Sequence, residues 1–151
     1  KGEVHMVAVI EFIAVLSCAL FTGAAIYITL VEHPARMGCD TKTAATVWAP
    51  SYKRATIMQA SLAILSFLAG VSAWLLSGVV IWLAGAVVYR LSRAVHFYRH
   101  HAHQPSTPGA WGDLASAETR KLLEKWGRLH AVRSVLSLAA SVIYLVLLFR
   151  A

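Results

Sequence analysis

The stretch ATIMQASLAILSFLAGVSAWLLSGVVIWLAGAVVY, residues 55–89, contains no charged side chain. A transmembrane helix needs about 20 apolar residues, so a run of this length predicts two membrane spans. Ser77 and Gly78 stand near its middle, and both residue types favour a tight turn. Two further apolar stretches, residues 7–31 and 134–149, flank the run. We therefore predict an all-α integral membrane protein, folded as a four-helix up-and-down bundle.

Composition and size agree with this prediction. Hydrophobic residues make up 58% of the 151 residues and charged residues 14%. A mass of 16.4 kDa leaves no room for a second domain beside four spans. The prediction is one transmembrane domain, residues 1–151, with spans at about 6–31, 54–76, 79–98 and 130–149.

The positive charge is distributed unevenly along the chain. The formal net charge is +7, and twelve of the 14 lysines and arginines fall in residues 36–54 or 90–133. This pattern predicts that the first and third connections are cytoplasmic and that both termini lie outside, in a bacterial inner membrane. It favours contact with membrane lipids and argues against nucleic acid as a partner.

Prolines and polar residues suggest where the helices end. Helix one is predicted to end at Glu32, His33 and Pro34, because proline disfavours helical geometry in the residue before it. A polar connection should then lead to Pro50, with helix two beginning near residues 52–54. Helix four is predicted to begin before its apolar part, as an amphipathic stretch from Ser116.

Glu11 is the carboxylate inside the first apolar run. Ionisable residues inside a membrane are costly and therefore suggest a function. Two interpretations stay open. The side chain extends to the outer headgroups, or it acts as a proton carrier or a hydrogen-bond partner between helices.

Helix three is anomalous because its apolar part, residues 78–89, spans only about 18 Å of a roughly 30 Å core. Basic residues follow at a spacing of three to four, and they suggest a face that meets anionic headgroups. A histidine-rich tract in the same segment suggests a metal site instead. Its members are His96, His100, His101 and His103.

Polar and aromatic residues gather where helix one ends and where helices two and four begin. In an up-and-down bundle these helix ends lie at the same membrane level, so the residues are expected to converge on a pocket. His130 and Arg133, three residues apart, share one helix face. The full set comprises Glu32, His33, Tyr52, Arg54, Gln59, Trp126, His130 and Arg133.

Three segments resemble the anthrone oxygenase-like family of small four-helix membrane proteins, long catalogued as a domain of unknown function. They are GAAIYITLVEHPAR (residues 23–36), VWAPSYKRATIMQASLA (47–63) and ETRKLLEKWGRLHAVRSVLSL (118–138). With the spans around them, they cover the greater part of the chain.

The segment YRLSRAVHFYRHHAHQPSTPGAW, residues 89–111, departs from that family, whose third span reads close to VPFTLIVIMPTN, followed by RLL. One codon choice for this segment, read one base later, spells IGSAVPFTFIVIMPTNRRLLAPG. We therefore expect residues 89–111 to be out of frame, with compensating errors near both ends. The alternative is a natural divergence that gives a short, basic helix three.

The resemblance implies binding or oxygenation of a hydrophobic aromatic small molecule, anthrone- or quinone-like, at an activated methylene. Such chemistry needs a base and donors that hold an enolate-like anion, and it requires no cofactor. The resemblance implies His33 or His130 as the base. Arg54, Arg133 and Tyr52 would stabilise the oxyanion.

Four further residues are implied as ligand contacts. Trp48 and Trp126 would stack on a flat ligand. Glu32 and Gln59 would lie beside them. The two tryptophans are alternatively interfacial anchors of the helices.

Other interpretations of the site stay open. Arg54 and Arg133 would otherwise neutralise Glu32 or contact lipid phosphate. His33 would help to turn the chain, or His33 and His130 would pair as metal or haem ligands. The alternative function is a non-catalytic accessory subunit of a larger membrane complex, and a homo-oligomer is a further possible assembly.

Overall fold

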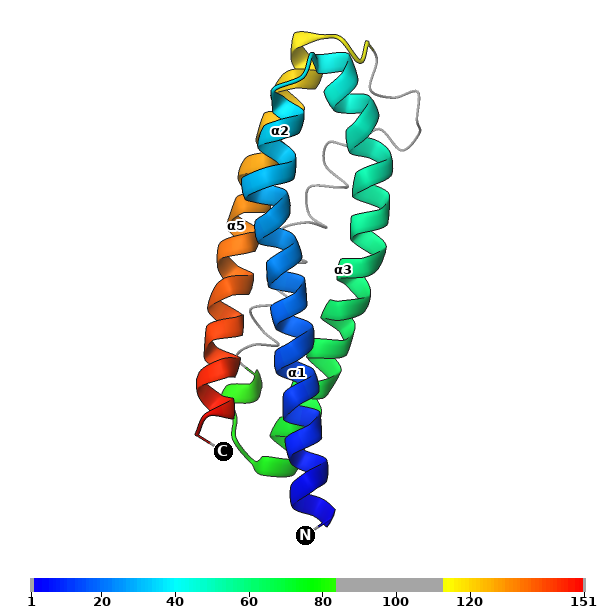
Figure 1. Cartoon of the computed structure of the whole chain (residues 1–151). Helices are drawn as coiled ribbons and strands as arrows, with labels where there is room; N and C mark the ends of the chain where they lie inside the picture. The colour runs from blue at the N-terminus through cyan, green and yellow to red at the C-terminus, as the bar shows by residue number, and fades with distance from the viewer. Residues whose placement is uncertain (1, 84–112, 151) are drawn as a thin grey trace.

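The structure, a computed structural model, describes residues 2–83 and 113–150. Its long helices run alongside one another, and both termini lie at the same end (Figure 1). The described residues contain no strand, which confirms the predicted all-α class. The elements are α1 (Gly2–Tyr27), the π-helix η1 (Ile28–Glu32), α2 (His33–Met37), α3 (Thr41–Ser77) and α5 (Ala117–Leu148).

Three helical stretches are long and apolar enough to cross a membrane: Val4–Met37, Thr41–Ser77 and Ala117–Leu148. Large apolar side chains such as Leu20, Leu68 and Val135 point outward, whereas buried positions are mostly small or polar. This distribution is typical of helices that face lipid on the outside and pack through small residues inside. The chain is an integral membrane protein.

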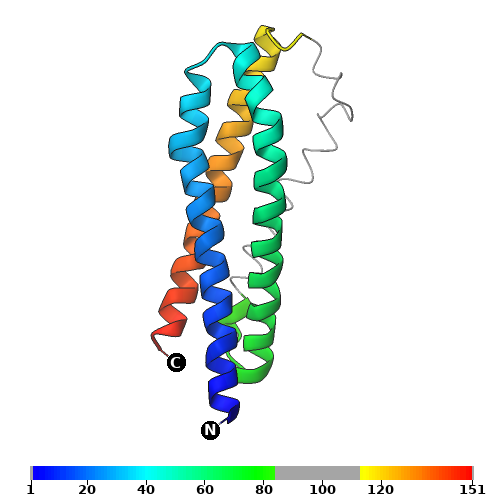
Figure 2. The same cartoon turned by 45° about the vertical axis from the view of Figure 1, so that its right-hand side comes forward.

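α1 contacts both α3 and α5, and the three helices run alongside one another (Figures 1 and 2). The predicted span at residues 79–98 lies outside the described residues beyond Leu83. The histidine-rich tract and the segment 89–111 also lie outside them.

The first helix does not end at Pro34, as the proline suggested. It passes through η1 and continues as α2 to Met37. Proline lacks a backbone N–H, and its ring clashes with the carbonyl four residues earlier in an α-helix. In a π-helix the backbone N–H donates to the carbonyl five residues earlier, and His33 N–H donates in this way to the carbonyl of Ile28. The π-turn therefore accommodates Pro34 without ending the helix.

The second helix also begins earlier than predicted. Asp40 caps α3 by accepting a hydrogen bond from the backbone N–H of Thr43 at 3.0 Å. Hydrogen bonds from Thr43 hold the pKa of Asp40 below its ordinary value. Because the N-cap fixes the start at Thr41, Pro50 lies inside α3, where the sequence had suggested a connection.

Two predicted boundaries are confirmed. α3 ends at Ser77, and Gly78 follows with a φ of 73°, a left-handed conformation that glycine adopts at helix ends. At the other boundary, Ser116 caps α5 by accepting from the backbone N–H of Thr119 at 3.1 Å. The amphipathic stretch and the last apolar run therefore form one helix.

α1 and α5 are joined by a row of small polar side chains. Cys18 Sγ lies 3.3 Å from Ser141 Oγ, and Thr22 Oγ1 lies 2.8 Å from the same oxygen. Thr22 also donates to the carbonyl of Ser137 at 2.9 Å. These hydrogen bonds fix how α5 is rotated against α1, and so determine which face of α5 carries His130 inward.

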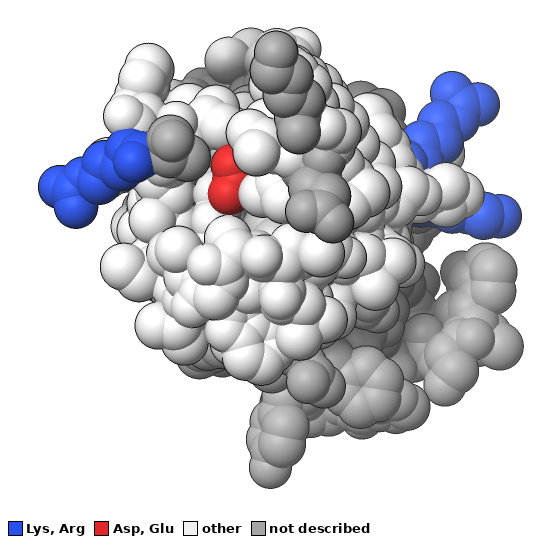
Figure 3. Space-filling view, turned by 90° about the horizontal axis from the view of Figure 1, so that it is seen from below, with Lys and Arg blue, Asp and Glu red and all other residues white. Residues whose placement is uncertain are grey.

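The end of the bundle that carries the termini is filled by aromatic side chains. Trp82 and Tyr144 are each about 1% exposed, and the Tyr144 hydroxyl donates to the carbonyl of Trp82 at 3.3 Å. Glu11 is also buried and has the Trp82 side chain as a hydrogen-bond partner. Seen from this end, the surface shows few charged side chains (Figure 3).

Candidate functional site

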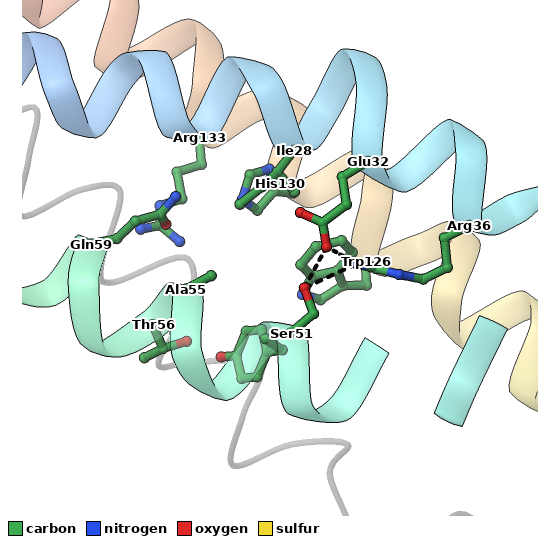
Figure 4. A pocket seen from close by; sticks show the side chains of 11 residues that line it. Ile28, Glu32, Arg36, Ser51, Ala55, Thr56, Gln59, Trp126, His130 and Arg133 are labelled. Atoms are coloured by element: carbon green, nitrogen blue, oxygen red, sulfur yellow. Dashed lines mark hydrogen bonds and ion pairs between the residues drawn. The ribbon is translucent and has the colours of Figure 1, made fainter. Parts of the chain in front are cut away.

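A pocket lies at the opposite end of the bundle, between η1, α2, α3 and α5 (Figure 4). Its cavity volume is about 10 Å³, and about 290 Å³ when all the space between its atoms and the part open to the surroundings are counted. It is lined by Ile28, Glu32, Arg36, Ser51, Tyr52, Ala55, Thr56, Gln59, Trp126, His130 and Arg133.

His130 enters the pocket from α5 and is held from behind by hydroxyl groups. Its side chain is 6% exposed, and its Nδ1 atom lies 3.0 Å from Thr29 Oγ1. Thr29 Oγ1 lies 2.7 Å from Ser134 Oγ and donates to the carbonyl of Ala25 at 3.0 Å. These contacts fix the position and orientation of the imidazole ring.

An ion pair forms one end of the pocket. The guanidinium of Arg36 contacts the carboxylate of Glu32 one helical turn earlier, and Ser51 from α3 donates to the same carboxylate oxygen. Arg36 Nη2 also lies 3.3 Å from Ser51 Oγ. Figure 4 shows these three side chains joined across the gap between the helices.

Gln59 and Arg133 form the other end of the pocket, where they face each other (Figure 4). Gln59 is 2% exposed, and no described residue accepts a hydrogen bond from its side-chain Nε2. The guanidinium carbon of Arg133 lies 4.7 Å from the ring centroid of Phe21, a distance that allows a cation–π contact. This end therefore offers N–H donors.

Aromatic rings form a wall beside these polar groups. Trp126 has its ring centroid 5.0 Å from that of His130 and 5.2 Å from that of His33. Tyr52 stacks on Trp48 at 4.8 Å with an interplanar angle of 11°. Trp126 meets both Tyr52 and Trp48 edge-on, at 6.2 Å and 5.8 Å.

The pocket contains six of the nine site residues that the sequence suggested: Glu32, Tyr52, Gln59, Trp126, His130 and Arg133. His33 and Trp48 do not line it, and they pack against Trp126 instead. Arg54 is exposed on α3 and also does not line it.

The sequence analysis missed three residues that shape the site: Thr29, Arg36 and Ser51. For Arg36, a signal was available, since it follows Glu32 by four residues and therefore lies on the same helix face. Thr29 and Ser51 gave no signal, because serine and threonine are common in membrane helices for packing alone.

No group of three or more potential metal ligands occurs within residues 2–83 and 113–150. The chemical groups that meet in the pocket are an imidazole, two guanidiniums, one carboxylate, an amide, two hydroxyls, a phenol and an indole. This set suits a flat, partly polar organic molecule, with donors for an oxygen atom and an imidazole for a proton.

Fold and pocket together define a small helical membrane protein with a polar, aromatic-walled site at one end of its bundle. Residues 48–143 match the sequence model of the family described as anthrone oxygenase, over more than half of the chain. The chain belongs to the anthrone oxygenase family, as its sequence segments suggested. No curated protein and no solved structure matches the chain significantly.

Proposed function

We propose that the pocket binds an anthrone-like molecule and promotes oxygenation of its activated methylene, with His130 as the base. The observation that carries this proposal is the meeting of His130, Arg133 and Gln59 in one pocket, beside the Trp126 ring. The family description supports the same substrate class. The Trp126 indole suits a flat aromatic molecule, because aromatic rings stack or meet edge-on when their centroids are about 4.5–7 Å apart.

The surroundings of His130 favour one neutral form of its ring. When the Thr29 hydroxyl donates to the carbonyl of Ala25, its oxygen accepts from Nδ1–H of His130. A neutral imidazole with its proton on Nδ1 carries its lone pair on Nε2. In the proposal, Nε2 removes the proton from the methylene of the ligand.

The charges of the pocket favour the anion that this proton transfer creates. Among the described lining residues, Glu32 is the one carboxylate, while Arg36 and Arg133 are two guanidiniums. A site with one excess positive charge stabilises a negative oxygen, most strongly where water is excluded. In the proposal, Arg133 and the Gln59 amide hold the enolate oxygen.

The overall reaction balances with molecular oxygen as the co-substrate. The enolate carbon attacks O₂ to give a peroxide anion, which takes up the proton that His130 had removed and becomes a hydroperoxide. The second methylene hydrogen then leaves as a proton while the O–O bond breaks, and this proton and the released hydroxide form water, which leaves a carbonyl group on the carbon. Anthrone and O₂ together give anthraquinone and water, so that dioxygen is the oxidant.

The test uses the purified full chain in detergent with anthrone as the substrate. Oxygen uptake and the absorbance of anthraquinone should rise together, one O₂ per anthrone. His130→Gln should lower kcat by about 100-fold or more, the range of a lost general base. His5→Gln is the matched control, because His5 is exposed near the opposite end, and it should keep the full rate.

Full activity in folded His130→Gln would contradict the role of His130. If the wild-type chain neither binds nor oxidises anthrone, the proposal fails, and the accessory-subunit interpretation becomes the better one. We further propose that the pocket end is cytoplasmic, because the described basic residues gather there, on residues 36–54 and 120–133.

A further inference from the structure

Arg36 has more hydrogen-bond donors than the described residues use. Its side chain is 6% exposed, and its Nη2 atom contacts Glu32 and Ser51. Its Nε and Nη1 atoms are buried, and within the described part of the chain no group accepts from them. A buried charged donor without an acceptor is costly, so a partner for it is expected.

We infer that Arg36 selects the ligand by donating a hydrogen bond to a ring oxygen at this end of the pocket. The preferred ligands are then aromatic molecules with a hydroxyl or carbonyl oxygen on the ring that lies near Arg36. This inference rests on the proposed function and names a specificity residue for it.

The neighbouring carboxylate strengthens the inference. Glu32 uses one oxygen for Arg36 and Ser51, and Figure 4 shows its second oxygen turned toward the interior of the pocket. A donor and an acceptor therefore stand side by side. A ring hydroxyl matches such a pair, because it accepts from the guanidinium and donates to the carboxylate.

This contact is separate from the proposed chemistry. Figure 4 shows Arg36 at one end of the pocket and Gln59 with Arg133 at the other. A ligand that spans the pocket would meet Arg36 with one ring and the proposed oxyanion donors with another part. Arg36 should therefore change which molecule binds and leave the proton transfer at His130 in place.

The test compares two unreactive probes, 1,8-dihydroxyanthraquinone and unsubstituted anthraquinone. Binding to the purified full chain is measured by quenching of tryptophan fluorescence, with empty detergent micelles as the reference for partitioning. The wild-type chain should bind the hydroxylated probe about tenfold more tightly or better, the range of a hydrogen bond to a charged group.

Arg36→Lys should remove most of this preference. Lysine keeps the positive charge beside Glu32 but lacks the planar fork that places Nε and Nη1. Binding of unsubstituted anthraquinone should stay within about twofold, since its outer rings carry no oxygen for Arg36 to contact. The double variant Glu32→Gln with Arg36→Gln provides a second, uncharged version if the lysine variant does not fold.

A matched control separates this effect from general disturbance. Arg54→Lys makes the same change at an exposed arginine of α3 that does not line the pocket, so the preference should persist. An unchanged preference in Arg36→Lys would overturn the inference.

The wild-type chain itself distinguishes the two proposals. If it oxidises anthrone but binds both quinones equally, the role of Arg36 is wrong and the proposed function stands. If it neither oxidises anthrone nor binds either quinone, both proposals fall together.

Discussion

At the end of the bundle that carries both termini, Trp82 and Tyr144 fill the space between the helices, and their buried neighbours are four alanines, Val15 and Cys18. At the other end, the space between η1, α3 and α5 holds charged and amide groups around a pocket. In the first region the Tyr144 hydroxyl donates to the carbonyl of Trp82, and buried Glu11 has the Trp82 side chain as its partner. In the second, Arg36 and Gln59 keep buried donors that no described residue satisfies.

The comparison shows how a small membrane protein combines stability with a polar pocket. Van der Waals packing of small residues and aromatic rings holds membrane helices together, because lipid supplies no hydrophobic drive between them. One apolar cluster lies near the termini, and a second, made of Ala44, Ala45, Trp48 and Leu123, lies at the opposite end, next to the pocket. These two clusters keep the helices in register around polar groups that are costly to bury.

The largest expected effect is loss of packing at the end of the bundle that carries both termini. Tyr144→Ala removes a ring that is 1% exposed, and the free energy of unfolding should fall by about 3–5 kcal/mol. Thermal unfolding in detergent measures this change. Tyr144→Phe, which keeps the ring and removes one hydrogen bond, should lose only about 1 kcal/mol. Equal losses in both variants would contradict the packing role.

Two glycines test the comparison directly. A methyl group at Gly70 would overlap the Tyr144 hydroxyl, and one at Gly127 would overlap the His33 ring. Tyr144 is enclosed, whereas His33 is half-buried and can rotate away. Gly70→Ala should therefore lower the free energy of unfolding by about 1–3 kcal/mol, and Gly127→Ala by less.

Gly23→Ala is the matched control for both glycine variants. No atom lies within 4 Å of an added methyl group there, and Gly23 is inside α1. Alanine should therefore raise the free energy of unfolding by about 0.5–1 kcal/mol through helix propensity. If Gly127→Ala lowers the free energy of unfolding as much as Gly70→Ala does, the pocket end is packed as tightly as the end that carries the termini.

A smaller effect on stability is expected at Thr29. Thr29→Val removes the hydroxyl beside His130 Nδ1 and should cost about 1 kcal/mol. It should also move the pH profile of anthrone oxidation, because the proton on His130 is then placed differently. Thr29→Ser keeps the hydroxyl and should restore the wild-type profile. A merely structural role would change stability without moving the profile.

The sequence was sufficient to predict the fold class and the position along the bundle at which the candidate site lies. Uncharged runs predicted membrane spans, and the turn at Gly78 and the start of α5 at Ser116 followed from local chemistry. The predicted end of the first helix at Pro34 and the predicted start of the second helix after Pro50 were wrong, because proline rules describe isolated helices. In a membrane bundle, π-turns and neighbouring groups take up the freed backbone positions.

The topology predicted which residues lie at one level, but it did not settle which face each one occupies. Tyr52 and Gln59 are seven residues apart and share the inner face of α3, whereas Arg54 follows Tyr52 by two residues and points outward. Helical periodicity alone would have separated these residues. The same periodicity would have predicted the ion pair of Glu32 and Arg36, because residues four apart lie on one helix face.

The prediction for residues 89–111 concerns the sequence itself and stays open. If the segment is out of frame, tryptic peptides of the protein will match VPFTFIVIMPTN, and none will end at Arg93 or Arg99. Mass spectrometry of residues 91–121 measures this directly. Peptides that end at those two arginines would establish the natural divergence instead.

The length of the helices has a consequence for how a ligand reaches the pocket. A core of roughly 30 Å corresponds to about 20 helical residues, and counting back from Leu148 along α5 leads to the neighbourhood of His130. The pocket then lies at the depth of the lipid headgroups. Under the proposed function, an aromatic substrate that partitions into the bilayer would be concentrated beside the pocket, and supply and product release would both run sideways through the lipid leaflet.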